Sequence, residues 1–385
     1  MLRKIRILLQ WATWLLLIGS FFLFGQQTAR AATVPFLTNP YYGSTLAIYS
    51  YFDHDIPTNL YGYTGDNLGV VTYQGGSAQS VRYTGHAGYD YLMNWKPILA
   101  SASGSVVQAQ WNDPTDHSYG CGLFVKLAHT NITPNHQTIY CHLSAILVKT
   151  GDSVAQKGQI GTSGNTGSSD APHLHFEVRV LNSNSQWLPT DPKGFATGQT
   201  DPWRVKSGVQ SVNLWKSSPV VGQPTNYGSF IIQDSVTNTA KFKKWCSADA
   251  TGVNCPYWEG VNIGSGGHMF YTYTNGTTVD YQAKWVPGAK IASSNNYEVF
   301  VWIPDANATS GAVRYTVYYN GGNRTIIVDQ NYTTNKWVSL GIYYFLAGKG
   351  YVKVVDAAYF SGYTDPANNK IGVDAIKFIR RSDIR

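Results

Sequence analysis

The sequence has few charged residues and no long stretch of helical periodicity. Lys, Arg, Asp and Glu make up 13% of its 385 residues, about half the share usual in soluble proteins. Glycine, tyrosine and tryptophan are plentiful instead, with 38, 27 and 12 residues. This aromatic content excludes a disordered chain, and the missing helical pattern favours β-rich domains of the kind found in exported proteins.

Short runs of alternating apolar residues, separated by Gly, Asn, Ser and Pro, fill the chain after residue 31. Such runs predict strands joined by turns, and the clearest cover residues 122–129, 137–143, 297–304, 312–319 and 350–357. A chain of this length usually divides its core between domains. We therefore expect two all-β domains, at 32–204 and 229–385, joined by a less periodic Ser-, Pro- and Gly-rich linker at 205–228.

The N-terminal segment has the three parts of a secretory signal. Arg3, Lys4 and Arg6 precede an apolar run from Ile7 to Phe24, and the sequence Ala-Arg-Ala at 29–31 follows. We expect residues 1–31 to be a signal peptide cleaved after Ala31, which makes the protein secreted or cell-wall associated. Because the apolar run is just long enough to span a bilayer, an uncleaved membrane anchor is the alternative.

The net charge is too small to indicate a nucleic-acid partner. Residues 1–31 hold four basic and no acidic residues, so their removal lowers the formal charge from +7 to +3. Proteins that bind nucleic acid through their overall charge carry a larger basic excess. We therefore expect no nucleic acid among the partners of the mature chain.

Cysteine is also scarce, with four residues. Export would place them in an oxidising compartment, where disulfides form. Four cysteines permit three pairings, and the spacing favours the two local bridges Cys121–Cys141 and Cys246–Cys255. A thiolate zinc site is the alternative, but neither pair has the C-x2-C spacing typical of one.

Two histidines lie one residue apart within an expected strand, "APHLHFEV" (171–178). Because side chains alternate along a strand, His173 and His175 share one face while Leu174 and Phe176 share the other. Histidine accounts for only 9 of the 385 residues. The pair therefore suggests a function on the polar face, although two unrelated surface histidines would give the same pattern.

Further candidate ligands occur in "YTGHAGYDY" (83–91) and "TIYCHLS" (138–144). A catalytic zinc ion takes three His or carboxylate ligands and leaves its fourth position open. His86, Asp90 and one histidine of the 173/175 pair meet that count. His142 and the other histidine then remain to hold water, move protons or stabilise an oxyanion. Taken alone, His86 and Asp90 would be interpreted as a surface ion pair. The zinc-site hypothesis therefore depends on the three motifs occurring together.

Six blocks in order resemble lysostaphin-type zinc metallopeptidases, over roughly residues 50–203. They are "GHAGYDY" (85–91), "PILASASGSVV" (97–107), "YGCGLFVKLAH" (119–129), "TIYCHLS" (138–144), "GDSVAQKGQIGTSGNTG" (151–167) and "APHLHFEV" (171–178). The resemblance implies a compact antiparallel β-sheet with a groove across it, one zinc ion per chain, and cleavage of peptide cross-links in bacterial peptidoglycan. It also implies that His86, Asp90 and His175 bind zinc while His142 and His173 are catalytic.

Three expectations accompany that resemblance. The glycine-rich stretch 161–173 would form a flexible wall of the groove, with an ordinary surface loop as the alternative. The family commonly lacks cysteines at 121 and 141, and alternation would turn the Cys141 side chain away from the site. The remaining histidines of this domain match no ligand motif and are expected to be surface or structural: His54, His117, His129 and His136.

Residues 229–385 contain no catalytic constellation. Segments such as "YQAKWVP" (281–287), "NYEVFVWIP" (296–304) and "KWVSLGIYYF" (336–345) resemble the golvesin and xanthan-lyase type of carbohydrate-binding-like β-sandwich. Most of their aromatic residues alternate as core residues do. Exposed Tyr and Trp would nevertheless stack on sugar rings, so a cell-wall or exported polysaccharide is the expected partner of this domain.

Three functions fit these features. The first is an active wall endopeptidase targeted by its C-terminal domain. The second is a catalytically inactive regulator of other cell-wall hydrolases. The presence of all five site residues argues against this second function. The third is a purely carbohydrate-binding wall protein.

Overall fold

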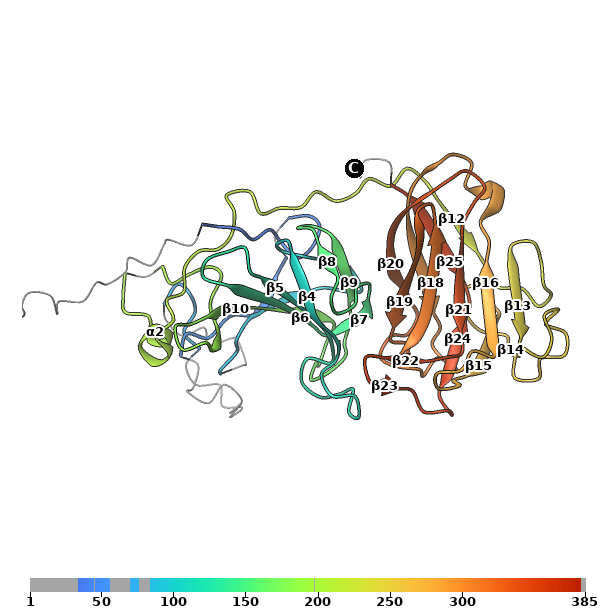
Figure 1. Cartoon of the computed structure of the whole chain (residues 1–385), viewed down its shortest axis with the longest axis horizontal. Coiled ribbons are helices and arrows are strands. Elements are labelled where there is room, and N and C mark those ends of the chain that lie inside the picture. The colour runs from blue at the N-terminus through green and yellow to red at the C-terminus, as the bar shows by residue number, and fades with distance from the viewer. Residues whose placement is uncertain (1–33, 45, 56–69, 76–83, 197, 382–385) are drawn as a thin grey trace, which may run out of the picture. The chain divides into compact units, whose positions relative to one another are not determined.

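The computed structural model describes residues 34–44, 46–55, 70–75, 84–196 and 198–381. They fold almost entirely into antiparallel β-sheets (Figure 1), which confirms the expected all-β class. The described residues from 35 onward form one compact unit. The expected signal peptide lies outside the described residues. Among those described, no helix has the length and apolar content needed to cross a membrane.

The first half of the described chain is built on a sheet in the order β1-β2-β10-β6-β5-β4-β8, with β11 paired to β10. The strands of this half and its one helix are β1 Ile48–Ser50, β2 Tyr89–Leu92, β3 Pro97–Leu99, β4 Gly104–Trp111, β5 Leu123–His129, β6 His136–Cys141, β7 Leu143–Ile146, β8 Ser153–Val154, β9 Gln159–Ser163, β10 His173–Leu181, β11 Trp187–Pro189 and α2 Pro202–Ser207.

Strand β10 shows why these residues form a sheet. Its even-numbered side chains are fully or almost fully buried in the core of this half: Leu174, Phe176, Val178 and Val180. Burying each such side chain contributes about 1.5–3 kcal/mol. The same alternation turns the odd-numbered, polar side chains toward the opposite face, so one local pattern fixes both the core and the site.

The second half contains two larger sheets. One has the order β12-β25-β17-β20, and the other begins β13-β16-β21-β18-β19 and continues through β7, β9 and β3. Smaller sheets join β14-β15-β24 and β22-β23. The elements are β12 Ser229–Ile232, β13 Phe242–Cys246, β14 Glu259–Val261, β15 Met269–Tyr273, β16 Tyr281–Trp285, η1 Gly288–Lys290, β17 Asn295–Ile303, β18 Val313–Tyr319, β19 Gly322–Val328, β20 Lys336–Phe345, β21 Tyr351–Val355, β22 Tyr359–Phe360, β23 Tyr363–Thr364, β24 Lys370–Val373 and β25 Ile376–Arg380.

The stretch expected to be a linker includes residues that pack on the first half. Leu214 is fully buried in the core that also contains Leu37 and Phe176. A β-bridge joins Leu37 to Trp215, and another joins Tyr42 to Val221. The 205–228 segment is therefore anchored at Leu214, Trp215 and Val221 rather than free. The domain boundaries themselves stay a prediction.

Both expected disulfides are formed, Cys121–Cys141 and Cys246–Cys255. Cys141 is fully buried beside Phe124 and Ile139, in a small cluster separate from the main core. Strand register places Cys141 directly opposite His175, and directly paired residues share a face of the sheet. The expectation that its side chain turns away from the site is therefore wrong. The first bridge ties the segment before β5 to the last residue of β6, immediately before His142.

Candidate active site

The candidate ligands lie on two neighbouring antiparallel strands and the loop before them. Strand register places His175 of β10 directly opposite Asp90 of β2, and His173 opposite Leu92. His86 precedes β2 by three residues and turns back over its start. The sequence therefore folds so that a cross-strand pair and a loop histidine meet on the face of β10 opposite the core.

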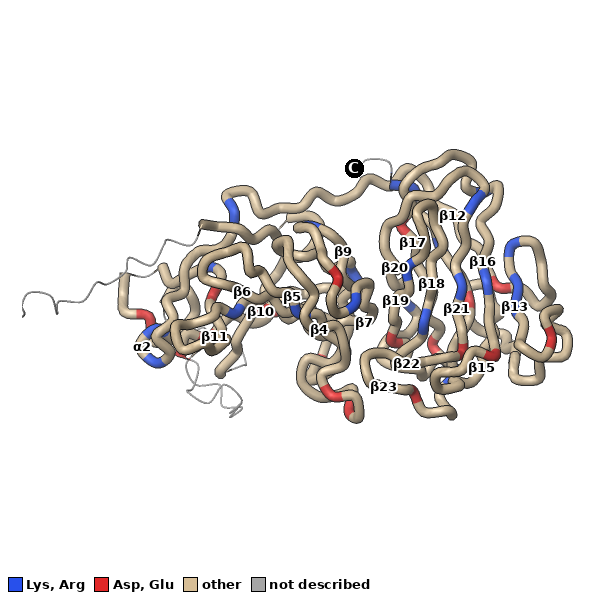
Figure 2. The backbone as a smooth tube through the Cα atoms, in the orientation of Figure 1, with Lys and Arg blue, Asp and Glu red and all other residues tan. Residues whose placement is uncertain are grey.

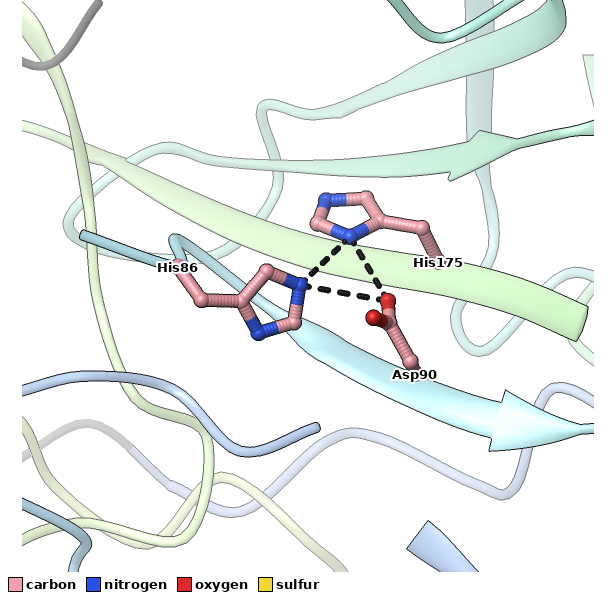
Figure 3. A group of neighbouring side chains, drawn as sticks. All are labelled: His86, Asp90 and His175. Carbon is pink, nitrogen blue, oxygen red and sulfur yellow. Dashed lines mark hydrogen bonds and ion pairs between the residues drawn. The ribbon is translucent and has the colours of Figure 1, made fainter. Parts of the chain in front are cut away.

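Three ligand-type atoms converge at this point, as Figure 3 shows. His86 Nε2 lies 3.1 Å from Asp90 Oδ1 and 2.9 Å from His175 Nδ1. The third distance, from His175 Nδ1 to Asp90 Oδ1, is 3.0 Å. The structure thus brings together all three residues that the resemblance assigns to the metal.

A missing side chain makes room for this arrangement. A Cβ atom at Gly88 would lie 2.6 Å from the carbonyl oxygen of Phe176 and 2.9 Å from Cε1 of His175. These separations are shorter than a carbon atom tolerates. Glycine at position 88 is therefore needed for β2 and the His175 ring to approach each other.

The charges at this point are strongly coupled. Burial would raise the pKa of Asp90, but His86 and His175 hold it well below its usual value. Burial would lower the pKa of His175, but Asp90 and Glu177 outweigh burial and raise it to about 9. The site is therefore a buried carboxylate that attracts positive charge, which is the electrostatic character of a cation site.

Outer contacts orient the two histidines of this cluster. Nδ1 of His86 donates to the carbonyl oxygen of Tyr51 at 2.8 Å, which leaves Nε2 with its lone pair toward Asp90 and His175. Glu177 lies 3.9 Å from Nε2 of His175 and 2.6 Å from Nε of Arg179. Sequence reasoning missed Glu177, although it continues the 173–175 alternation along the same face.

The donor set fits a zinc ion. Two imidazole nitrogens and one carboxylate oxygen are ligands that Zn²⁺ prefers, and three protein ligands are the number found in catalytic zinc sites. The backbone carbonyl on His86 and the carboxylate beside His175 are the kind of second contact that orients metal-binding histidines. Residues His86, Asp90 and His175 are also the one set of metal-ligand type that the described part of the chain brings within 4.8 Å.

The two expected catalytic histidines lie beside this cluster. The rings of His142 and His173 are 4.5 Å apart, and the His142 ring is 6.1 Å from that of His175. Nε2 of His173 lies 3.7 Å from Asp90 Oδ1. The structure thus gathers the five residues around one point, from three separate stretches of sequence.

The backbone of His142 is unusual. This residue stands between β6 and β7 with a positive φ of 61°, a left-handed conformation that is uncommon for any residue but glycine. Its backbone N–H donates to the carbonyl oxygen of Cys121 at 2.9 Å, and its Nδ1 donates to that of Thr166 at 2.7 Å. These two bonds hold the imidazole in a conformation that strand alternation would not have produced.

The rings of His142 and His173 are both neutral at physiological pH, and both keep their lone pair on the same nitrogen, Nε2. Burial, together with His173 and His175, lowers the pKa of His142 to about 3, and burial also lowers the pKa of His173. Nδ1 of each ring faces a carbonyl oxygen, at 2.7 Å for His142 and 2.8 Å for His173. A carbonyl can only accept, so Nδ1 carries the proton and Nε2 keeps the lone pair.

The sequence of this region matches the model of peptidase family M23, over residues 84–189. Residues 84–189 form an M23 peptidase domain. A second model, the golvesin C-terminal domain, matches residues 247–380. Both resemblances stated from the sequence are thereby confirmed.

Individual relatives agree with the first match. The chain is 37% identical to glycyl-glycine endopeptidase ALE-1 of Staphylococcus capitis over 157 residues, which is 40% of this chain and 39% of ALE-1. It is 40% identical to peptidoglycan DD-endopeptidase ShyA of Vibrio cholerae over 100 residues, covering 26% of this chain and 21% of ShyA. The chain thus spans less than half of either relative.

Among solved structures, the catalytic domain of the antimicrobial peptidase lysostaphin from Staphylococcus simulans is similar. The two are 34% identical, and the match covers 37% of this chain and 86% of that domain with a TM-score of 0.26.

Within the M23 domain, the glycine-rich stretch does more than border the site. Gly164, Thr166 and Gly167 are buried, and a Cβ at Gly167 would lie 2.3 Å from the backbone nitrogen of Gly122. Residues 164–167 are therefore packed rather than an ordinary surface loop. They supply the carbonyl oxygen of Thr166 that orients His142.

The four histidines without a ligand motif have structural surroundings. His129 bonds to Ser103 and Thr138, His136 to Pro134, and the His117 ring stacks on Trp111 at 3.5 Å. His54 is fully buried between Asp191 and Asp201. That carboxylate pair was not foreseen, because it joins residues about 140 positions apart.

Proposed function

We propose that this protein is an exported, zinc-dependent endopeptidase that hydrolyses peptide cross-links of bacterial peptidoglycan. The observation that carries the proposal is the convergence of His86, Asp90 and His175 beside two neutral histidines within an M23 domain. The names of two relatives, a glycyl-glycine endopeptidase and a peptidoglycan DD-endopeptidase, support the substrate class. Export follows from the signal-like segment 1–31, with the cell wall as the place of action.

His86, Asp90 and His175 would hold the metal through Nε2, Oδ1 and Nδ1, the atoms that already face one another. When bound there, Zn²⁺ supplies acidification of water and polarisation of the scissile carbonyl. Asp90 provides the negative charge that retains a divalent cation, and the contacts at Tyr51 and Glu177 fix the two rings. These three residues would thus fix the place at which water and the scissile carbonyl meet.

The neighbouring histidines perform the proton chemistry. Because Nε2 of His142 and of His173 carries a lone pair, either ring accepts a proton from the attacking water. Once protonated, the same atom donates to the developing oxyanion or to the departing amine. Removing one such group typically slows an enzyme by about a hundredfold or more.

The alternative functions differ in what they require of these residues. An inactive regulator of other hydrolases would not need five side chains held by backbone carbonyls and carboxylates around one point. A wall protein that only binds carbohydrate would need none of them. The completeness of the site therefore favours the active enzyme.

Substitution of the ligands tests the proposal. Asp90→Ala or His175→Ala should lose zinc and hydrolysis together, whereas His142→Ala should retain zinc and lose most activity. His117→Ala, which removes a ring that stacks on Trp111 and matches no ligand motif, is the matched control and should keep both. Metal analysis and a turbidity assay on purified cell walls measure the two properties. Full wall lysis by the His142 variant, or a wild-type protein that holds no zinc, would contradict the assignment.

The products identify the bond. Amide hydrolysis should release new amino groups from peptidoglycan and no new reducing sugar ends, and mass spectrometry of the fragments would name the cross-link. New reducing ends would show a glycosidase and refute the proposal.

The C-terminal domain would act as a tether. We propose that residues 229–385 bind a cell-wall or exported polysaccharide and so raise the local concentration of the peptidase at its polymer. Deleting the domain is a blunt test, because Ile327 and Val328 of β19 pair with Ile146 and Ala145 of β7. Substitutions on its outer surface leave that strand pairing intact.

A further inference from the structure

One face of the golvesin-type domain carries a row of cations. It is the outer face of the sheet formed by β13, β16, β21 and β18, whose other face is buried in the core of this domain. Figure 2 shows basic positions on each of these four neighbouring strands. The residues concerned are Lys243, Lys284, Lys353 and Arg314, all exposed or half-exposed.

Strand register aligns three of them. Lys243 of β13 lies opposite Lys284 of β16, and Lys284 lies opposite Lys353 of β21. Adjacent strands are about 4.8 Å apart. Like charges directly opposite each other destabilise a sheet. The alignment of these three lysines therefore lowers the stability of the folded domain through their mutual repulsion.

No carboxylate of the described residues lies within ion-pair distance of these four cations. Their neighbours are aromatic rings, an amide and, for Arg314, the backbone carbonyl oxygen of Tyr359. Lys284 Nζ lies 5.1 Å from the ring centre of Tyr351, and Lys353 Nζ donates to Oε1 of Gln282 at 3.4 Å. The positive charge of the row is thus left for a ligand to neutralise.

Aromatic rings border the row on both sides. Tyr318 and Tyr351 stack at 4.2 Å on one side, and Trp245 lies on the other, 6.0 Å from Lys284 Nζ. All three rings are half-exposed. Aromatic faces of this kind pack against the C–H faces of sugars, whereas the lysines attract negative charge.

We propose that this face binds a linear anionic wall glycan whose repeat units carry phosphodiester or carboxylate groups, chiefly through the three aligned residues Lys243, Lys284 and Lys353, which we call the lysine row. The inference rests on the proposed function, because it names the polymer class that the tether recognises. Charge complementarity selects an anionic polymer over a neutral one, and the flanking rings select a glycan over other polyanions. A sheet face that crosses several strands suits an extended chain.

The test compares two full-length variants with equal loss of charge. Lys243→Gln, Lys284→Gln and Lys353→Gln together remove the lysine row. Lys149→Gln, Lys157→Gln and Lys349→Gln remove three exposed lysines elsewhere. The probes are a ribitol-phosphate teichoic acid, polygalacturonate, neutral dextran and duplex DNA, with affinity measured at low and high salt.

The lysine-row variant should bind the anionic glycan about tenfold or more weakly, while the control stays within about twofold of the wild type. Binding should fall as salt rises, and dextran should not compete. The teichoic acid and polygalacturonate arms tell phosphate from carboxylate recognition. Equal weakening of both variants, equal competition by dextran, or tighter binding of DNA than of either glycan would overturn the proposal.

Two further measurements keep a folding defect or an inactive enzyme from deciding the result. The lysine-row variant should unfold at the same or a slightly higher temperature, because repulsion is removed, and Lys→Arg at the three positions should retain binding. Hydrolysis of a soluble cross-link peptide should be unchanged in both variants. The inference would be contradicted if binding were lost together with a lowered unfolding temperature and without rescue by arginine. A protein that binds the glycan but hydrolyses no peptide would contradict only the peptidase proposal.

Discussion

A buried histidine that bonds to two aspartates should make the protein less stable at alkaline pH. The His54 side chain is fully buried, with Nδ1 2.8 Å from Asp201 Oδ1 and Nε2 3.1 Å from Asp191 Oδ2. Neutral imidazole has only one N–H, so donation to both carboxylates requires the protonated ring. Burial would lower the pKa of His54, but Asp191 and Asp201 raise it to about 9.

The size of the effect follows from that shift. Each pKa unit corresponds to 1.36 kcal/mol, so a rise from 6.5 to about 9 contributes about 3 kcal/mol to the free energy of unfolding. Because the folded-state pKa is the higher one, this contribution is fully present below about pH 6.5 and is lost as pH rises through about 9. For a domain of this size, about 3 kcal/mol corresponds to roughly 6–12 °C in unfolding temperature.

Thermal unfolding between about pH 6 and pH 10 measures this loss. The comparison protein is the double variant His54→Gln, Asp191→Asn, because removing the imidazolium alone would leave Asp191 buried without a counter-charge. A chelator in every sample removes metal binding as a variable. All four cysteines are in disulfides, so no thiol titrates in this range.

The wild type should lose its advantage over the double variant as pH rises. His129→Gln is the matched control, since His129 is equally buried but bonds only to a carbonyl and a hydroxyl. Its difference from the wild type should not change over this alkaline range. A constant difference between wild type and double variant from about pH 6 to 10 would refute the assignment of a protonated His54.

Two other predictions concern the metal site. Gly88→Ala should abolish zinc binding while the protein stays folded, because the new methyl group displaces the His175 ring; Gly222→Ala, which has open space around it, is the control. Zinc analysis and circular dichroism would decide, and a zinc-loaded Gly88 variant would contradict the predicted clash. Glu177→Gln should weaken zinc affinity by about tenfold or more, because Glu177 supports His175. Competition with a chromogenic chelator measures this, and unchanged affinity would show that Glu177 serves only Arg179.

Local chemistry allowed much of the site to be predicted. The alternation at 173–176 depends only on the period of a strand, so it separated His173 and His175 from Leu174 and Phe176 before any partner strand was known. The same holds for the strand runs and the short-range pairing of Cys246 with Cys255. The resemblance to M23 peptidases then named His86, Asp90 and His142, which composition and spacing alone left as candidates.

Other features required the three-dimensional arrangement. Which nitrogen of His175 faces Asp90 depends on the pairing of β10 with β2, and the orientation of His142 depends on a left-handed backbone and on the Thr166 carbonyl. Strand alternation alone would have turned the side chain of His142 to the face of the sheet opposite that of Cys141. Glu177 follows the predicted pattern, but its proximity to His175 is a matter of rotamers rather than of sequence.

The sequence by itself determined the class of the protein and the chemistry available to it, because period, turn residues and ligand types act over a few neighbouring positions. Only the tertiary structure decided which of those residues act together. His54 with its two aspartates, and the row formed by Lys243, Lys284 and Lys353, depend on strand register and on contacts between distant segments. A shift of one residue in register turns a side chain to the opposite face of a sheet, and no local pattern in the chain specifies that register.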